Sequence, residues 1–283
     1  MDWSEREKHV FKQIEAWEQN LLQYEPTDFE RMYDKWIIRG FDRLDSNVKE
    51  QFFKSLDNWL FHLHAFIQSS DSQMNARERL LKEARIFNEQ IDQISDMKQL
   101  SIDQLVYIAD QQIAKYRIYS FTQGGLAGTG GALLGADIPA MIVLNLRAVQ
   151  NVALVYGYDV NVPFEMMTSL KVFHSATLPK RMRGAGWVKL VEEAQQIEEH
   201  YYYLYEKDED LTDESWFEQP LIQILKSIVM MMFRNKLIQG LPLISMAVGA
   251  SMNYKLARQV TDFAHKYYQM RYLQDKQNSD FWS

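Results

Sequence analysis

Apolar residues recur along this chain at intervals of three and four, which is the spacing of one face of an α-helix. Ser101, followed three residues later by Gln104, indicates the start of a helix, because these two side chains can cap one another's backbone. Leu178-Pro179 marks a helix end. The pattern predicts helices over residues 4–24, 28–41, 47–69, 74–95, 101–120, 164–174, 187–205 and 216–270, the last with a break near Gly240 and Pro242.

No segment alternates apolar and polar residues as a half-buried strand would. The six prolines are concentrated at the edges of the predicted helices, and residues 206–214 form an acidic loop. We therefore expect an all-α fold, a single multi-helix domain. Residues 1–100 are predicted to form a helical extension that packs on a helical core of residues 101–283.

Six of the twelve glycines lie between Gly124 and Gly135. A nucleotide-binding loop is excluded on its motif, since no Lys-Ser or Lys-Thr follows and the third glycine of G-x-G-x-x-G is replaced by Leu133. Glycines four apart instead let another helix approach closely. The helix-packing glycines we predict are Gly124, Gly128, Gly131, Gly135 and Gly249.

From Phe121 to Leu146 the single charged residue is Asp137. Asp137 and Pro139 interrupt this run, so two helices meeting near residues 136–139 are expected rather than one span. A second uncharged segment, residues 237–252, is expected to pack against the first. Three interpretations follow: a tightly packed soluble core, which the pattern favours, a shallow membrane-inserted hairpin, or a transmembrane helix.

Polar residues interrupt the apolar helix that follows Pro139, and Arg147, Gln150 and Asn151 share one face. A buried Arg147 needs a partner, for which Asp110 and Asp137 are candidates. The group is interpreted either as an internal hydrogen-bonded network, which we favour, or as a polar cleft for an anionic headgroup or a peptide. The candidate cleft comprises Asp110, Asp137, Asn145, Arg147, Gln150 and Asn253.

One compact basic cluster stands out, formed by Lys180, Arg181 and Arg183 with Trp187 after it. Two glycines in the same stretch predict an exposed basic turn. Basic residues beside an aromatic side chain suit an anionic membrane surface. A plain solvent-exposed turn explains the cluster equally well.

The composition of the chain excludes several kinds of site and disfavours one class of ligand. With no cysteine there is no disulfide and no thiolate nucleophile, and His62 and His64 point apart on a helix, so we predict no metal site and no cofactor. The net charge of −7 disfavours nonspecific nucleic-acid binding. Residues 1–13 lack the apolar stretch of a secretory signal, so a cytoplasmic location is expected.

Six segments stand out together by their order and spacing: residues 107–110, 123–128, 137–139, 144–150, 156–158 and 249–254. With these segments the chain resembles the EcsC family, and the first hundred residues look like its Bacillus-type members. The resemblance implies association with an ABC transporter system linked to secretion and membrane-protein processing, and it brings no catalytic residues. We expect a cytoplasmic accessory protein, peripheral at the inner membrane face, whose partners are ABC transporter subunits or the anionic membrane surface. The alternative is a hydrolase that uses the polar cleft.

Overall fold

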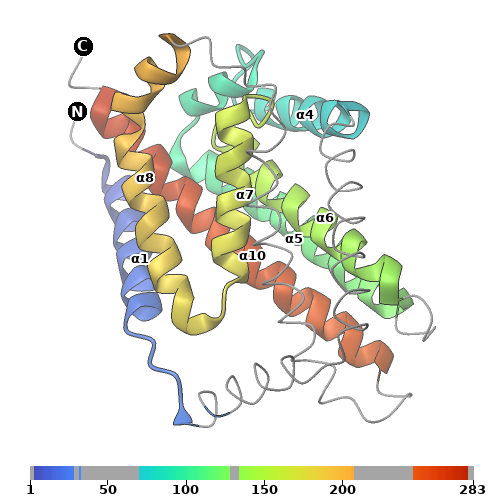
Figure 1. Cartoon of the computed structure of the whole chain (residues 1–283). Helices are drawn as coiled ribbons and strands as arrows, with labels where there is room; N and C mark the ends of the chain where they lie inside the picture. Colours follow the sequence, from blue (N-terminus) through green and yellow to red (C-terminus); the bar gives the residue numbers. More distant parts are fainter. Residues whose placement is uncertain (1–2, 29–31, 33–69, 128–133, 207–244, 280–283) are drawn as a thin grey trace.

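The computed structural model describes residues 3–28, 32, 70–127, 134–206 and 245–279. Every regular element in these ranges is helical, which confirms the predicted all-α class. The described part forms one helical domain (Figure 1). Its elements are α1 (Glu5–Leu22), α4 (Ser70–Arg85), the 3-10 helix η1 (Ile94–Gln99), α5 (Ile102–Ala127), α6 (Leu134–Val155), α7 (Pro163–Thr177), α8 (Lys180–Glu206) and α10 (Ser245–Ser279).

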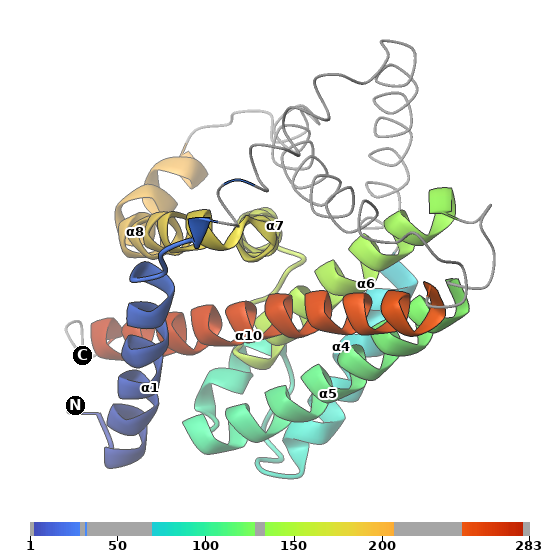
Figure 2. The same ribbon diagram turned by 90° about the horizontal axis from the view of Figure 1, so that it is seen from below.

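Helix α10 is the central element of the fold. It runs through the described domain, with α5 and α6 alongside much of its length and α1 and α8 against its C-terminal half (Figures 1 and 2). Helix α7 packs on α10, α6 and α8. Buried side chains of α10 such as Val260, Phe263 and Tyr268 therefore meet partners from every side, and the apolar core follows this helix.

The first helix begins as the sequence predicts. The hydroxyl of Ser4 accepts a hydrogen bond from the backbone N–H of Glu7, and the Glu7 carboxylate accepts one from the backbone N–H of Ser4, so both groups are satisfied. Farther along α1, the ring of Trp17 packs edge-on against Trp187 of α8 and Phe263 of α10, with centroids 4.9 and 5.6 Å away. This aromatic contact holds α1 and α8 on α10.

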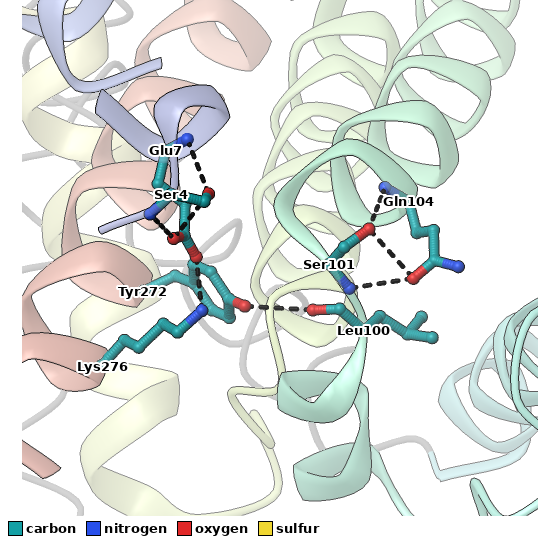
Figure 3. A network of polar contacts seen from close by, with 7 residues as sticks. All are labelled: Ser4, Glu7, Leu100, Ser101, Gln104, Tyr272 and Lys276. Atoms are coloured by element: carbon teal, nitrogen blue, oxygen red, sulfur yellow. Dashed lines mark hydrogen bonds and ion pairs between the residues drawn. The ribbon is translucent and has the colours of Figure 1, made fainter. Parts of the chain in front are cut away.

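A second polar network joins the starts of α1 and α5 to the end of α10 (Figure 3). Lys276 pairs with Glu7, and the Tyr272 hydroxyl donates to the carbonyl of Leu100 at 3.0 Å. Burial alone would raise the pKa of Glu7, but hydrogen bonds from Lys276 and Ser4 hold the pKa of this carboxyl below its usual value.

The predicted cap of α5 is present beside this network. The Ser101 backbone N–H donates to the Gln104 side-chain oxygen at 2.9 Å, and the Gln104 backbone N–H donates to the Ser101 hydroxyl at 3.4 Å. Both bonds are drawn in Figure 3.

A buried ion pair fixes α7 to α10. Both terminal nitrogens of Arg271 donate to the two carboxylate oxygens of Glu165 at 2.6 Å, and the two side chains are 7% and 12% exposed. The Tyr158 ring lies 4.0 Å from the same guanidinium. Because each charge is buried with its partner, removing either one alone should cost about 3–5 kcal/mol of stability.

Helix α6 ends on a glycine. Gly157 has φ +83°, and the two hydrogen bonds of a Schellman motif are present, from Tyr158 N–H to the Ala153 carbonyl and from Gly157 N–H to the Leu154 carbonyl. A Cβ atom at this position would also lie 2.6 Å from Cγ of Lys98. This end of α6 therefore depends on glycine for both its conformation and its contacts.

The helix predicted over residues 74–95 is wrong at its C-terminal end. Helix α4 stops at Arg85, whose Nε donates to the carbonyl of Ile91 at 2.7 Å. The Asn88 side chain accepts a hydrogen bond from the Gln90 backbone at 3.0 Å, and such local bonds favour a turn over a helix. The chain resumes as η1 before α5 begins.

The expected meeting of two helices near residues 136–139 is displaced. Helix α5 ends at Ala127 and α6 begins at Leu134, so Asp137 and Pro139 lie inside α6 rather than at its boundary. Pro139 has no backbone N–H, so its presence near the start of α6 removes one backbone hydrogen bond.

The predicted exposed basic turn is also a helix. Helix α8 begins at Lys180, and its two glycines are the points where neighbours come close. A Cβ on Gly184 would lie 3.1 Å from Cδ2 of Leu22, and one on Gly186 would lie 3.1 Å from Cβ of Ser175. These glycines therefore serve close packing with α1 and α7.

Other predictions lie outside the described residues. These are most of the helices predicted over 28–41 and 47–69, nearly all of the acidic loop 206–214, and the break near Gly240 and Pro242.

Candidate functional site

A groove of about 280 Å³ lies between α5 and α10. The two helices run side by side there (Figure 2). The groove is lined by apolar side chains and by ionisable ones, which is the mixture expected of a small-molecule site. Its lining residues are Asp110, Ile113, Ala114, Arg117 and Ile118 of α5 and Tyr254, Asp262 and His265 of α10.

An acid and an imidazole meet in the groove. Oδ1 of Asp110 lies 3.8 Å from Nδ1 of His265, and Nε2 of the same ring is hydrogen-bonded to the hydroxyl of Tyr156 at 2.8 Å. Burial, followed by the nearby charges of Lys266 and Arg117, lowers the pKa of His265 to about 3. His265 is therefore neutral near pH 7, and it does not balance the charge of Asp110.

The Asp110 carboxyl has a raised pKa. Desolvation is the main cause; Asp262 adds to it, whereas Arg117 and Lys266 oppose it. Two-thirds of the Asp110 side chain is nevertheless exposed to solvent. This carboxylate can therefore meet a ligand directly.

The second acid of the groove is already paired. Arg117 Nη2 lies 2.6 Å from Oδ1 of Asp262, and Arg258 Nε lies 3.7 Å from Oδ2. The Nε of Arg117 donates to the Thr261 hydroxyl at 2.9 Å. Asp262 and Arg117 therefore neutralise one another across the two helices.

The described residues of the predicted polar cleft have different surroundings in the structure. Asp110 lies in the groove, whereas Asn145 is buried in α6 and donates to the Met141 carbonyl at 2.8 Å. Gln150 is buried as well, and Arg147 is partly buried beside Tyr116, not beside Asp110. Within the described residues, the side-chain oxygen of Asn145 and the amide nitrogen of Gln150 have no hydrogen-bond partner.

Asn151, which follows Gln150 in α6, forms part of an internal network of hydrogen bonds. The side-chain amide of Asn151 donates to the side-chain oxygen of Gln112 at 3.2 Å, and Gln112 donates to Glu83 at 2.7 Å. These bonds link α6, α5 and α4. Asn253 lies on α10, partly buried, and Asp137 lies in α6 with a side chain outside the described set.

The predicted basic cluster occupies the first turn of α8. Lys180 lies 5.1 Å from the ring of Tyr24, and Nε of Arg183 donates to the Leu178 carbonyl at the end of α7. Arg181 is exposed, but Trp187 is 1% exposed and donates to Glu18 at 2.7 Å. The aromatic member of this patch is therefore a core residue and cannot reach a membrane surface.

Three of the predicted packing glycines lie in described helices. Gly124 is near the end of α5, Gly135 is near the start of α6, and Gly249 is near the start of α10. Gly128 and Gly131 lie outside the described residues. The ends of α5, α6 and α10 lie together at one end of the molecule (Figures 1 and 2).

Exposed apolar side chains gather at this end, which we call the apolar tip and define as Ile118, Phe121 and Tyr254. They are 60%, 51% and 39% exposed. The rings of Phe121 and Tyr254 pack edge-on with centroids 6.4 Å apart, so the tip joins α5 to α10. Large exposed apolar residues gathered in one place indicate a contact surface.

Two further features bear on function. Among the described residues no three side chains of His, Cys, Asp or Glu gather in a way that suits a metal ion. No helix in those ranges combines the length and the apolar character needed to cross a bilayer.

Comparison with known proteins identifies the family. The model of the EcsC protein family matches residues 8–273, nearly the whole chain. This chain belongs to the EcsC family. It is 26% identical to the uncharacterized protein YdbA of Bacillus subtilis over 152 residues, which is 52% of this chain and 53% of YdbA. It is 25% identical to protein EcsC of the same organism over 181 residues, which is 64% of this chain and 69% of that protein.

The chain thus spans about half the length of YdbA. No solved structure matches it. The match to the EcsC family extends beyond residues 107–254, which hold the segments that carry the resemblance in the sequence. It includes α1 and α4, which pack on the EcsC core in the structure.

Sequence reasoning missed most of the groove of this EcsC protein. Asp110 was among its candidates, but His265, Arg117 and Asp262 were not. The available signal was the spacing of Asp110 and Arg117 by seven residues, and of Asp262 and His265 by three, which places each pair on one helix face. Nothing in the sequence shows that these two faces meet.

Proposed function

We propose that this protein is a peripheral membrane protein, an accessory factor that attaches to an anionic membrane surface through the apolar tip. The observation that carries the proposal is the exposure of Ile118, Phe121 and Tyr254 together where α5 and α10 converge. The tip adjoins the glycine-rich, weakly charged segment around residues 124–135. Aromatic rings that are partly buried and partly wet suit the boundary between headgroups and acyl chains.

The charges around the tip support an anionic surface. Over residues 111–127 of α5 and 245–261 of α10 the charged residues are all basic: Lys115, Arg117, Lys255 and Arg258. Lys115 pairs with Glu83, and Arg117 and Arg258 share Asp262, so the local excess of positive charge comes from Lys255 and from two arginines on one acid. Arg258 is 66% exposed one turn from Tyr254. Each basic residue held near an anionic leaflet contributes about 1 kcal/mol. Burying one large apolar side chain adds about 2 kcal/mol.

Co-sedimentation with lipid vesicles tests the proposal. The purified full-length chain is expected to bind vesicles that contain phosphatidylglycerol more tightly than vesicles of phosphatidylcholine alone. Phe121→Ser should weaken this binding about tenfold, because it removes one buried apolar side chain. Ile86→Ser is the matched control, since Ile86 is 81% exposed beside α4, away from the tip. Equal loss in both variants would contradict the proposal.

Cell fractionation extends the test to the native membrane. Attachment that a high-salt wash releases agrees with peripheral, electrostatic binding. Retention through both salt and carbonate would instead mean that apolar segments enter the bilayer. Binding to membranes that contain the ABC transporter, with none to protein-free vesicles, would contradict lipid recognition and favour a transporter subunit as partner.

A hydrolase is the second candidate, favoured by the contact of Asp110 with His265. This pair resembles an acid–base pair, but the residues that line the groove include no serine, threonine or lysine to act as a nucleophile. A broad hydrolase screen with the native chain and the Asp110→Ala variant tests this candidate. Turnover that the variant abolishes would support it, and no turnover of any substrate class would remove it.

A further inference from the structure

We infer that the groove between α5 and α10 binds a small organic cation, a primary ammonium compound with a short apolar chain. The ammonium group would pair with Asp110, and the apolar chain would lie along Ile113, Ala114 and Ile118 toward the ring of Tyr254. This inference goes beyond the proposed membrane attachment and does not depend on it.

The charges of the groove select a cation. Asp262 is paired with Arg117 and Arg258, so neither that acid nor Arg117 is left for a ligand. Asp110 has as its contact a histidine that is neutral near pH 7. Among the groove residues, Asp110 is therefore the charged group that is not balanced by a direct ion pair, and it is negative.

The walls and size of the groove select a short apolar chain. Ile113, Ala114 and Ile118 stand at helical spacing on the face of α5 that also carries Asp110. Tyr254 of α10 also lines the groove and adds an aromatic ring that an alkyl chain can contact. A volume of about 280 Å³ equals that of roughly nine water molecules, which n-hexylammonium would fill.

Titration calorimetry on the full-length chain at pH 7.5, without lipid, tests the inference. The probe is n-hexylammonium, and its expected dissociation constant is roughly 0.1–1 mM. Hexanol and hexanoate, which have similar chains without the positive charge, should bind at least tenfold more weakly. Ethanolamine, which has the ammonium group without the chain, should also bind more weakly. The assignment would be overturned if hexanol, hexanoate or ethanolamine bound as tightly as n-hexylammonium.

Two variants locate the site. Asp110→Asn keeps the shape of the side chain and should weaken n-hexylammonium at least tenfold. Asp103→Asn, the same change on an exposed residue seven positions earlier in α5, is the matched control and should change nothing. Ala114→Leu leaves the charge in place but fills the groove, so it should also abolish binding.

Each variant has an outcome that contradicts the inference. Unchanged affinity in Asp110→Asn would exclude the carboxylate. If Asp110→Asn lost n-hexylammonium binding but Ala114→Leu kept it, the cation would bind on the outer surface rather than in the groove. Circular dichroism is used to check that each variant is folded. Phe121 does not line the groove, so the vesicle experiment and this one can fail separately.

Discussion

At the scale of single residues, His265 has the most informative environment. Its ring lies between the Tyr156 hydroxyl on one side and Asp110 on the other, and it also packs near the Tyr156 ring. Lys266 beside it on α10 and Arg117 across on α5 both disfavour protonation, and Asp262 lies on the same helix. Because burial opposes a positive charge most strongly, the folded protein keeps this histidine neutral at pH values where an unfolded chain protonates it.

Stability should therefore depend on pH through His265. Its pKa is about 3 in the folded state and about 6.5 when unfolded, so the unfolded chain binds the extra proton between these values. The contribution is fully present above pH 6.5 and is lost as pH falls, by about 1.4 kcal/mol per pH unit. Urea denaturation of the native chain and of His265→Gln from pH 4 to 7.5 measures this.

The His265→Gln variant keeps a hydrogen-bonding group near Tyr156 but cannot titrate. Its stability should fall less steeply than that of the native chain between pH 6.5 and 4. Glu7, whose carboxyl has a lowered pKa, contributes to the acid loss equally in both proteins, so the difference isolates His265. Parallel pH profiles would show that the histidine does not carry this dependence.

At the scale of elements, the two glycines of α8 determine how closely its neighbours approach. Gly184 faces the end of α1, where the Leu21 carbonyl would lie 3.3 Å from an added Cβ. Backbone cannot move aside as a side-chain tip can, so a branched side chain must push α1 away. That displacement would also disturb the packing of Trp17 on Trp187 and Phe263.

We expect Gly184→Val to lower the free energy of unfolding by about 2–3 kcal/mol through overpacking at the α1–α8 contact. Ala185→Val is the control, because Ala185 is exposed on the same turn and tests the helix propensity of valine alone. Thermal denaturation of both variants measures the difference. A similar small loss in each would show that α1 does not depend on this close approach.

The sequence predicted elements better than their boundaries. The cap at Ser101 is a local, three-residue signal, and its hydrogen bonds are present where that signal places them. The end of α4, the start of α6 and the start of α8 were misplaced. In α8 a glycine pair that suggests a turn is tolerated because neighbouring helices need the space, and a single sequence does not contain that tertiary cause.

The candidate site was predicted less completely for a similar reason. Asp110 stands out as an acid in an apolar helix, but its partner His265 is 155 positions away, and their contact depends on how α5 and α10 are aligned. The interpretation of Trp187 as part of a membrane patch requires an exposed ring, but this ring is buried. Its burial follows from the packing of α1 and α10 on α8.

At the scale of the whole molecule, charge is distributed unevenly. The net charge is −7, so the protein as a whole is repelled by an anionic membrane. The basic residues beside the apolar tip oppose this locally, because fields fall off within about 10 Å at 0.1 M salt. Membrane attachment should therefore occur in one orientation, with the shared end of α5 and α10 toward the lipid.

Neutralising the basic residues tests this orientation. The double variant Lys255→Gln, Arg258→Gln should bind vesicles with phosphatidylglycerol about tenfold more weakly, and its binding should depend less on salt. The control is the double variant Lys12→Gln, Lys189→Gln, which changes one exposed lysine on α1 and one on α8, away from the tip. It changes the net charge by the same amount and should bind vesicles like the native chain. Co-sedimentation across salt concentrations distinguishes the two, and an equal loss in both would mean that net charge alone governs binding.

The central position of α10 has a consequence for biosynthesis. This helix of 35 residues, about 52 Å long, contacts α1, α5, α6, α7 and α8, yet it is translated after all of them. The apolar faces of the earlier helices cannot be covered until it leaves the ribosome, since the surface that covers them has not been made. Nascent chains should therefore need chaperone protection until residues 245–279 have been made, and a ribosome stalled before residue 245 should carry a chain sensitive to protease.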